Sequence, residues 1–452
     1  MTRTRRQLLG LGIASFLGSL VTGTASGTAQ TAGRDLSGRR VIVVGAGLAG
    51  LAAAQDLRAS GAEVVVFEAG SRVGGRIRTD RSMGVPVEHG AAWIHGPGGG
   101  NPISELARSQ GAPRFETDDN SLQVFDAAGN ELGDAAYARL ERMYDGLAYG
   151  IETTTAANDP RSLHRAMADL DPDLVDTPLG RWMLSAYFEF DLGADLRQVS
   201  AANAFEGNGF AGNDVILPAG YDRLLAPFMA GLDIRLNTPV RRISYAPSGA
   251  NVDGMAADFV VCAVPLGVMK SGAITFDPPL PAPLRDAVAQ IGFGTVTKIA
   301  LKFDKPFWPT DTQYFGMMTQ PQGRWNYWLN YRRFSDHNIL LGFSFGSYAA
   351  QADRMRPSEM THDALKVLRS VWGTAVAHPT QVLTTHWSQD PHFKGAYSFP
   401  QTGGTIAQFD RFAQPVAGRL FMAGEHTLFD HHGTTHGALL SGRRAARAIA
   451  QA

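Results

Sequence analysis

Three features are scarce in this 452-residue chain: cysteine, net charge and long apolar runs. Cys262 is the only cysteine, so no intramolecular disulfide can form and stability must come from packing. It lies in the apolar run FVVCAVP, which indicates a buried and inert thiol rather than a nucleophile. No group of histidines and cysteines has metal-ligand spacing, so we predict no metal site.

The charge balance excludes one class of partner. The formal net charge is -1 at pH 7, which gives no electrostatic case for nucleic acid or an anionic membrane surface as a partner. With 44% apolar and 18% charged residues, the chain has an ordinary globular composition. Its length exceeds the roughly 250 to 300 residues at which one core usually stops growing, and this predicts two domains.

The N-terminal apolar segment is short. Leu8 to Val21 would span only about 21 Å as a helix, against about 30 Å of hydrocarbon, so stable membrane insertion is not expected. Arginines precede this segment and small residues follow it, which predicts a signal peptide over residues 1–29. The pair Arg5-Arg6 resembles a twin-arginine export signal, and a general secretory signal is the alternative. Either one predicts an exported protein, periplasmic or extracellular.

Residues 41–68 have the pattern of a β-α-β unit that binds a dinucleotide. A β-branched apolar run leads into Gly45, Gly47 and Gly50, which have the G-x-G-x-x-G spacing. These glycines permit a tight turn, close approach of the backbone to a pyrophosphate, and close helix-to-strand packing. Glu68 ends the second strand, where a carboxylate can accept hydrogen bonds from the hydroxyls of an unphosphorylated ribose.

The segment after Glu68 favours FAD over NAD. It contains a second glycine pair, Gly74-Gly75, followed closely by Arg76 and Arg78. Backbone amides and guanidinium groups of this kind suit a second contact along the pyrophosphate. Taken alone, the segment could equally be a basic turn.

Further motifs follow in a fixed order along the chain. They are GGRIRT, VEHGAAWIHG at 87–96, LPAGYDRL at 217–224, NTPVRRI at 237–243, VVCAVPLGVMK at 260–270, GFGTVTKIALKFDKPFWP at 292–309, FMAGEHT, and GTTHGALLSGRRAA near the C-terminus. Together with the β-α-β unit, this order resembles the flavin-containing amine oxidase family, which includes polyamine oxidases, monoamine oxidases and lysine-specific histone demethylases. The resemblance is closest to the polyamine oxidases.

The resemblance implies an α/β fold, in which a Rossmann-type FAD-binding domain carries an inserted α+β substrate-binding domain. It places the FAD-binding domain in residues 38–95, 212–270 and 385–452. It places the substrate-binding domain in residues 96–211 and 271–384. The patterns agree, because 134–210 is helical in periodicity and 292–350 contains alternating and aromatic runs.

Three residues are the predicted catalytic set. Lys298 lies in VTKIALKF, where alternation puts it on one strand face with Ala300 and Lys302. By pattern alone this is a solvent-facing lysine, whereas the resemblance implies that Lys298 holds a water beside the flavin. Trp387 and Tyr397 flank WSQDPHFKGAYSF and would pack against the flavin and the amine, or else belong to the core.

The resemblance also implies how FAD is held. Ala396 stands where monoamine oxidases have their flavin-linking cysteine, so we predict non-covalent FAD. Glu425 would accept a ribityl hydroxyl, and Thr435 begins a helix whose amides could face the flavin. The predicted cofactor-binding residues are Gly45, Gly47, Gly50, Glu68, Gly75, Arg76, Val240, Trp387, Glu425 and Thr435.

The predicted substrate-binding residues are His95, Glu189, Tyr397 and Thr434. His95 and Glu189 match polar positions near the amine in relatives, and Asp191 and Asp195 could add negative charge. The histidine could equally be structural, and the acids could form an exposed helix face. The WIHG segment, Ala396 and the GTTHGA ending favour a polyamine oxidase, which transfers hydride from the carbon beside the amine to flavin N5. O2 would then give hydrogen peroxide, and the imine would hydrolyse to an aldehyde.

Other functions remain open at this point. An exported dehydrogenase or oxidase of small amines or L-amino acids could use another acceptor, such as a carrier protein. An amino-acid substrate would need an arginine for its carboxylate, and Arg114 and Arg181 are unassigned. A non-catalytic FAD-stabilised binding protein is the third alternative, although it would leave Lys298 and the aromatic pair without a purpose.

Overall fold

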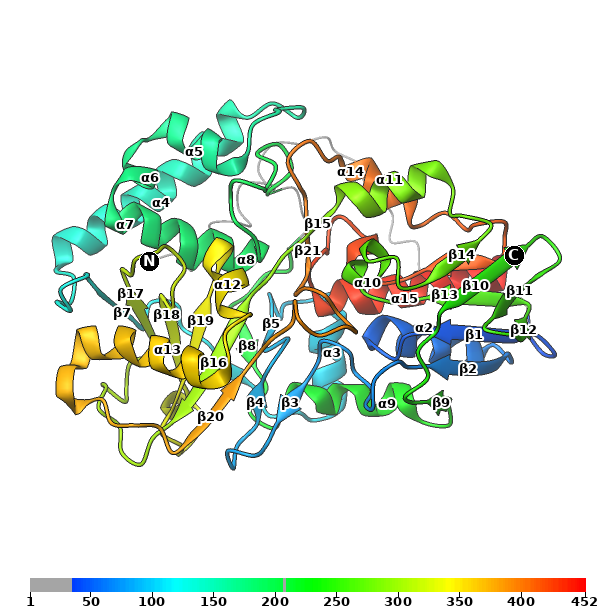
Figure 1. The fold of residues 1–452 in the computed structure, drawn as a ribbon, viewed down its shortest axis with the longest axis horizontal. Coiled ribbons are helices and arrows are strands. Elements are labelled where there is room, and N and C mark those ends of the chain that lie inside the picture. Colours follow the sequence, from blue (N-terminus) through cyan, green and yellow to red (C-terminus); the bar gives the residue numbers. More distant parts are fainter. Residues whose placement is uncertain (1–34, 206–208) are drawn as a thin grey trace.

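The computed structural model describes residues 35–205 and 209–452, which form two adjoining regions (Figure 1). One region is built on a parallel sheet with strand order β22-β13-β1-β2-β9. Its strands are β1 (Arg40–Val44), β2 (Glu63–Phe67), β9 (Asp233–Arg235), β13 (Phe259–Cys262) and β22 (Leu420–Met422). They come from segments far apart in the chain, so this region is discontinuous.

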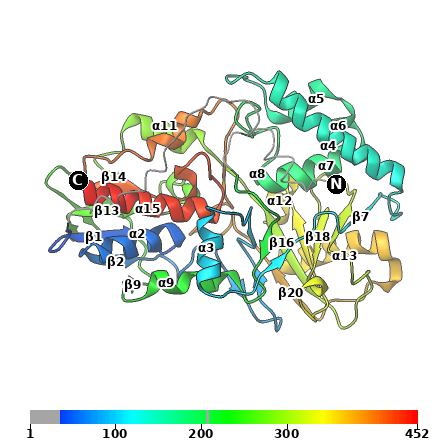
Figure 2. The same ribbon diagram turned by 180° about the vertical axis from the view of Figure 1, so that it is seen from behind.

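Helices cover one face of the parallel sheet. Helix α2 (Leu48–Ala59) joins β1 to β2, and helix α15 (Thr435–Gln451) packs against α2 (Figures 1 and 2). The two helices touch closely because Gly442 has no side chain, and a Cβ there would lie 2.1 Å from the Ala49 carbonyl oxygen. Helices α3 (Pro102–Ser109) and α9 (Ala226–Met229) pack against the same core.

The other face of the parallel sheet packs on a four-stranded sheet with order β12-β11-β10-β14. Its strands are β10 (Arg242–Ala246), β11 (Gly249–Val252), β12 (Met255–Ala257) and β14 (Thr275–Asp277). Helices α10 (Leu266–Lys270), α11 (Ala282–Gln290) and α14 (Ile406–Arg411) flank it. The arrangement is a layered α/β domain, in which each apolar face of the central sheet is covered.

The second region has a six-stranded sheet with order β20-β16-β19-β18-β17-β7. The strands are β7 (Leu122–Phe125), β16 (Thr297–Lys302), β17 (Tyr314–Met317), β18 (Tyr327–Asn330), β19 (Ile339–Ser344) and β20 (Gln381–Thr384). Helices α12 (Gly346–Ala352) and α13 (Pro357–Trp372) accompany one face. The other face packs on α4 (Asp134–Thr154), α5 (Leu163–Leu170), α6 (Asp173–Asp176), α7 (Pro178–Met183), the π-helix η1 (Leu184–Glu189) and α8 (Phe190–Leu192).

Small sheets connect the two regions. They are β3 (Thr79–Asp80) with β4 (Val87–Glu88), β5 (Trp93–Ile94) with β8 (Val215–Ile216) and β6 (Phe115–Glu116), and β15 (Gly292–Phe293) with β21 (Ser398–Phe399). Short 3-10 turns complete the described chain at η2 (Tyr221–Leu225), η3 (Tyr331–Arg333), η4 (Gly373–Ala375) and η5 (Glu425–Thr427).

The predicted fold is confirmed, including the β-α-β unit, and the segment predicted to be helical, 134–210, is helical as far as Leu192. Two segments pack differently from the predicted domain division. Ile103 and Ala107 of α3 belong to the core of the parallel-sheet region, as do Ile274 and Leu284 around β14 and α11. The predicted domain division assigned these segments to the substrate domain, and its boundaries stay a prediction.

The predicted signal peptide, residues 1–29, lies outside the described residues. Across 35–205 and 209–452, no helix is both long and apolar enough to cross a membrane.

Candidate active site

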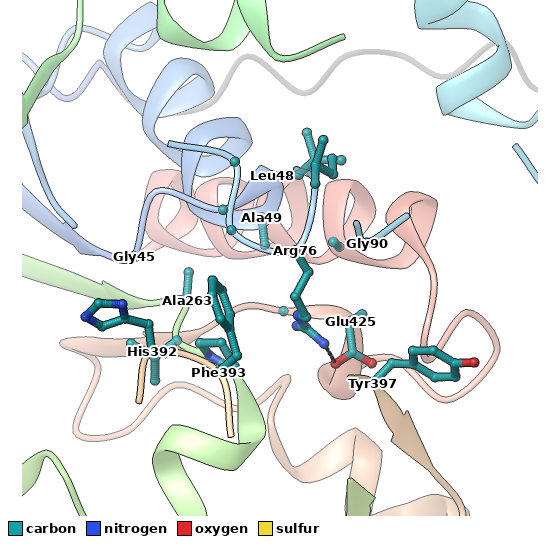
Figure 3. Close-up of a pocket in the computed structure, with 18 of the residues that line it drawn as sticks. Gly45, Leu48, Ala49, Arg76, Gly90, Ala263, His392, Phe393, Tyr397 and Glu425 are labelled. Atoms are coloured by element: carbon teal, nitrogen blue, oxygen red, sulfur yellow. Dashed lines mark hydrogen bonds and ion pairs between the residues drawn. The ribbon is translucent and has the colours of Figure 1, made fainter. Parts of the chain in front are cut away.

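A cavity of about 530 Å³ lies where the two regions meet (Figure 3). This volume is in the range of small-molecule and cofactor sites. Most predicted site residues line it, although they come from distant parts of the chain. The predicted residues that line it are Gly45, Gly47, Glu68, Gly75, Arg76, His95, Val240, Lys298, Trp387, Tyr397, Glu425, Thr434 and Thr435. Gly50 and Glu189 do not line it.

The glycines of the turn after β1 differ in whether protein atoms surround them. A Cβ at Gly50 would lie 1.9 Å from the Gly45 carbonyl oxygen, so Gly50 serves the turn itself rather than the cavity. Gly45 has a φ of +103°, which strongly favours glycine. A Cβ at Gly47 would meet no protein atom within 4 Å, and Gly47 lines the cavity. Here a bound group can approach the backbone.

Glu68 closes the turn from the end of β2. Its carboxylate accepts backbone N–H groups of Ala46 at 2.8 Å and Gly70 at 2.7 Å. Each carboxylate oxygen keeps acceptor capacity, and the residue lines the cavity. Gly74 and Gly75, with φ of +101° and +60°, bring the second glycine pair beside the first turn, where Gly74 donates to the Ala46 carbonyl at 2.8 Å.

An ion pair joins Arg76, which is partly exposed, to the buried Glu425 at the cavity wall (Figure 3). Arg76 Nη1 lies 2.8 Å from Glu425 Oε1 and also donates to the Ala396 carbonyl at 2.7 Å. Glu425 Oε2 accepts the Ser398 hydroxyl at 2.5 Å and the Gly433 N–H at 2.8 Å. Burial alone would raise the pKa of the Glu425 carboxyl, but Arg76 and the hydrogen bonds lower it to about 2.

The N-terminus of helix α15 also reaches the cavity. Thr434 caps the helix by accepting the Gly437 N–H at 3.0 Å, and Thr435 shares a 2.8 Å hydrogen bond with the Tyr221 hydroxyl. Both threonines and Ala438 line the cavity. The partial positive charge of a helix N-terminus therefore faces the site from α15, as it does from α2.

Lys298 is buried, so the solvent-facing interpretation of its strand is wrong. The face of β16 that carries Lys298 lies against residues 88–93, with Nζ 6.0 Å from the centroid of the Trp93 ring, and Lys298 is only 7% exposed. Its Nζ donates to the carbonyl oxygens of Glu88 at 3.2 Å and Gly90 at 2.5 Å. Burial lowers the pKa of the Lys298 ammonium to about 8, against an opposing effect of the Glu88 carboxylate.

Glu88 is a second buried group beside Lys298. Its carboxylate accepts the backbone N–H of Tyr221 at 2.8 Å and the hydroxyl of Thr79 at 2.7 Å. Burial raises the pKa of the Glu88 carboxyl to about 7, although these hydrogen bonds and Lys298 oppose the shift. Burial therefore shifts the pKa values of two neighbouring groups on this side of the cavity towards neutral pH.

The aromatic pair of the predicted catalytic set is held by hydrogen bonds to backbone carbonyls. The Trp387 indole N–H donates to the His89 carbonyl at 3.1 Å. The Tyr397 hydroxyl donates to the Phe190 carbonyl at 2.6 Å. Both rings line the cavity, so neither is only a core side chain.

His95 lines the cavity beside the smaller pocket and has an acidic partner. Its Nδ1 lies 2.6 Å from Asp214 Oδ2. A smaller pocket of about 20 Å³ adjoins the cavity here, room for about one water-sized group. Its lining combines carboxylates, a histidine and aromatic rings: Trp93, His95, Asp119, Phe190, Asp191, Asp214, Tyr314 and Tyr327.

Glu189 does not line the cavity. It is the last residue of the π-helix η1, and its side chain is buried against Gly346. A Cβ added at Gly346 would lie 2.5 Å from Glu189 Oε1. The following residues, Phe190 and Asp191, line the cavity instead. Asp195 is also outside the lining and accepts the Ser347 hydroxyl. Of the three acids named from the sequence, Asp191 alone lines the cavity.

A family model described as flavin containing amine oxidoreductase matches residues 48–450. The chain belongs to this family. Rice (Oryza sativa subsp. japonica) "Polyamine oxidase 4" is 32% identical over 435 residues, covering 90% of this chain and 87% of the relative. Arabidopsis thaliana "Lysine-specific histone demethylase 1 homolog 2" is 33% identical over 435 residues, covering 90% of this chain and 58% of that protein.

The fold of this amine oxidoreductase matches solved structures of putrescine oxidase. The wild-type structure bound to putrescine has a TM-score of 0.71 at 22% identity, covering 90% of this chain and 98% of that one. The match supports the two-region α/β architecture described above.

The cavity of this amine oxidoreductase fits FAD, its family's cofactor. Gly47 leaves room for a pyrophosphate, two helix N-termini face the cavity, and Glu68 stands at the strand end that suits a ribose. FAD, when bound, accepts a hydride equivalent from the carbon beside the reacting nitrogen. The protein holds it non-covalently: Ala396 has no nucleophile, and Cys262 lies outside the cavity lining, its pKa raised to about 12 by burial.

Sequence reasoning missed several lining residues of this oxidoreductase. Phe190, Trp93 and Phe393 reach the cavity from three separate segments, and no local motif distinguishes them from core aromatics. Neither Arg114 nor Arg181 lines the cavity, so neither meets the requirement for an amino-acid carboxylate. Among the described residues no group of three or more metal-ligating side chains comes together.

Proposed function

We propose that this amine oxidoreductase is a polyamine oxidase. The observation that carries the proposal is the composition of the small pocket beside the cavity, where Asp119, Asp191 and Asp214 stand among four aromatic rings. Carboxylates attract ammonium groups, and aromatic faces attract cations and pack on methylene chains. A second ammonium of the substrate would bind there while the reacting nitrogen lies deeper, beside Lys298.

The protein groups have separate tasks in this proposal. Aromatic residues Trp387, Tyr397 and Phe190 exclude water and orient the alkyl chain. Lys298, with its pKa near 8, can hold or release a proton at Nζ close to the reacting centre. Asp191 and the His95–Asp214 pair would fix the remote charge of the substrate, so that its length decides which carbon is oxidised.

The same proposal includes O2 as the electron acceptor, giving hydrogen peroxide and an imine that hydrolyses to an aldehyde. A buried lysine amine that can hold water supports this acceptor. A carrier protein is the rival acceptor. Peroxide formed per amine consumed separates the two, and a yield well below one peroxide per amine would favour the carrier.

Putrescine and butylamine provide a direct test of the substrate class, because both have four carbons and only putrescine has a second ammonium. We expect spermine, spermidine and putrescine to have a far higher kcat/KM than butylamine. Asp191→Asn should lower kcat/KM for putrescine about 10-fold and leave butylamine unchanged. Equal use of the two amines by the unaltered enzyme would contradict the proposal.

We also propose that the enzyme is exported, because arginines precede the N-terminal apolar segment and small residues follow it. Replacing Arg5 and Arg6 by lysine should keep the full-length enzyme in the cytoplasm if the twin-arginine route is used. The mature N-terminus, read by mass spectrometry from the exported fraction, tests cleavage near Ala29. An unprocessed N-terminus in every fraction would oppose the proposal.

A further inference from the structure

Asp353 is a buried carboxylate outside the cavity lining. It follows helix α12 and is 0% exposed. Its Oδ2 accepts the backbone N–H of Ser388 at 2.8 Å and the Ser388 hydroxyl at 2.5 Å. The Thr297 hydroxyl shares its one proton between the Ala349 carbonyl at 2.8 Å and Asp353 Oδ1 at 3.3 Å. Since these donors are neutral groups of two separate segments, the carboxylate ties the segments together.

Each tied residue is next in sequence to a predicted catalytic side chain. Thr297 precedes Lys298 on strand β16, and Ser388 follows Trp387 in the loop after β20. Thr297 is completely buried and also donates to the Ala349 carbonyl at 2.8 Å, so its position is well defined. The Asp353 carboxylate therefore reaches both catalytic segments from behind, on the side away from the cavity.

The loop that carries Trp387 has two more ties to the same place. The Lys298 N–H donates to the Thr385 hydroxyl at 2.8 Å, and the Thr385 N–H donates to the Lys298 carbonyl at 3.1 Å. His386 Nδ1 lies 2.8 Å from the Asp353 carbonyl oxygen. The regular pairing of β16 with β20 ends at Thr384. Beyond that residue, these contacts hold the two segments in position relative to each other.

The tips of Lys298 and Trp387 are anchored on one short segment in front. Lys298 Nζ donates to the carbonyls of Glu88 and Gly90, and the Trp387 indole N–H donates to the carbonyl of His89 between them. Both side chains are thus held at their tips by residues 88–90 and at their bases by Asp353. A shift at the base would move both tips relative to the cavity.

We propose that Asp353 is a positioning residue for amine oxidation, which fixes Lys298 and Trp387 relative to each other through Thr297 and Ser388. The proposal rests on the proposed function, in which these two side chains contact the cofactor and the amine. A buried carboxylate with good donors rigidifies its surroundings, and small displacements of positioned groups cost large factors in rate.

The test compares two carboxylate-to-amide substitutions in the holoenzyme. Asp353→Asn removes one acceptor oxygen from the tie between the catalytic segments. Asp363→Asn is the control, because Asp363 also accepts several hydrogen bonds, from Arg324 at 2.6 Å, Trp325 at 2.8 Å and Tyr348 at 2.5 Å, and does not line the cavity, although its Arg324 partner is charged. Both variants should lower the thermal midpoint.

Only Asp353→Asn is expected to change the site. The absorption band of the bound oxidised flavin should shift, and kcat for spermine should fall about 10-fold with KM changed less than about twofold. Thr297→Val should reproduce both effects, whereas Thr297→Ser, which keeps the hydroxyl, should not. Asp363→Asn should leave the flavin band and kcat unchanged.

The proposal is overturned if Asp353→Asn lowers the thermal midpoint but leaves the flavin band and kcat as they are in Asp363→Asn. It is also overturned if Thr297→Val behaves like Thr297→Ser. The flavin band and the thermal midpoint need no substrate. A failure of the polyamine assignment would therefore appear as absent turnover in the unaltered enzyme, while the spectral comparison would still test Asp353.

Discussion

The two ends of the cavity differ in how their charges are held. At the cofactor end, Glu425 is paired with Arg76 and its pKa is lowered to about 2, so its charge is constant over the whole working pH range. At the amine end, burial brings the pKa of Lys298 down to about 8 and raises that of Glu88, a neighbour outside the cavity lining, to about 7. One end keeps a single charge state, whereas the other can exchange protons near neutral pH.

This difference suits the two tasks. A cofactor that stays bound through many turnovers needs an unchanging set of partners, and paired charges with satisfied hydrogen bonds provide one. Amine oxidation needs a group that gains or loses a proton at the working pH, and burial beside a single acid provides that. The predictions below test whether each end behaves as its charges indicate.

The largest effect is expected at the cofactor end. Arg76→Met would leave Glu425 buried without its cation, and breaking such a pair costs about 3–5 kcal/mol. We expect a strongly lowered free energy of unfolding and loss of bound flavin, measured by urea titration and by the absorbance ratio of flavin to protein. Arg39→Met, which breaks the exposed Arg39–Asp258 pair, should cost less than about 1 kcal/mol. A similar loss of unfolding free energy in the two variants would contradict the claim that the Arg76–Glu425 pair is the stronger one.

A smaller loss, in rate rather than in binding, is expected at the amine end. Lys298→Met should slow a flavin redox step about 100-fold, because it removes the proton-carrying group, while FAD stays bound. Stopped-flow absorbance of flavin reduction and reoxidation measures this step. Lys302→Met is the control, since Lys302 lies on the same face of β16 but donates to the Met83 carbonyl instead. Loss of flavin from Lys298→Met would contradict the assignment of cofactor binding and proton exchange to different ends of the cavity.

Gly47→Ala should affect cofactor binding without affecting the fold. The added methyl group meets no protein atom within 4 Å and the φ of -74° accepts alanine, so the apoprotein should unfold at the same urea concentration. The methyl group would occupy space next to the pyrophosphate, and the dissociation constant of FAD should rise about 10-fold. Unchanged FAD affinity would mean that the cofactor does not approach this turn.

The smallest expected effect is on stability at alkaline pH. The lowered pKa of Lys298 means that the unfolded chain binds more protons than the folded chain between about pH 8 and 10.5. Stability should therefore rise with pH in this window, by roughly 1 kcal/mol from pH 8 to pH 9. Urea unfolding at the two pH values, compared with Lys298→Met, isolates this contribution. A flat or falling difference would show that Lys298 is not held as an unfavourably buried cation.

The two ends also differ in how well the sequence predicts them. Gly45, Gly47 and Glu68 are predictable because a local backbone turn requires them within one short segment. Lys298 was predicted on the correct strand, but its burial depends on residues 83–93, which cover its face of the strand, and alternation carries no information about them. The strand pattern alone therefore indicated that Lys298 faces solvent.

The acid at the amine end shows a second limit. Glu189, Asp191 and Asp195 are equally acidic in sequence, and only the three-dimensional course of η1 and α8 decides that Asp191 lines the cavity. A π-helix changes the angular spacing of side chains, so α-helical periodicity misplaces its residues. The partner of His95, Asp214, is 119 residues away and no motif links the two.

The central claim is that this cavity joins a fixed flavin site to an amine-oxidising end that binds a second ammonium. Anaerobic mixing of the purified holoenzyme with spermine, followed by the visible absorbance of the flavin, tests it most directly. The account predicts rapid and complete bleaching by spermine and much slower bleaching by butylamine at the same concentration. An oxidised flavin spectrum that stays unchanged with spermine, spermidine and putrescine would contradict it.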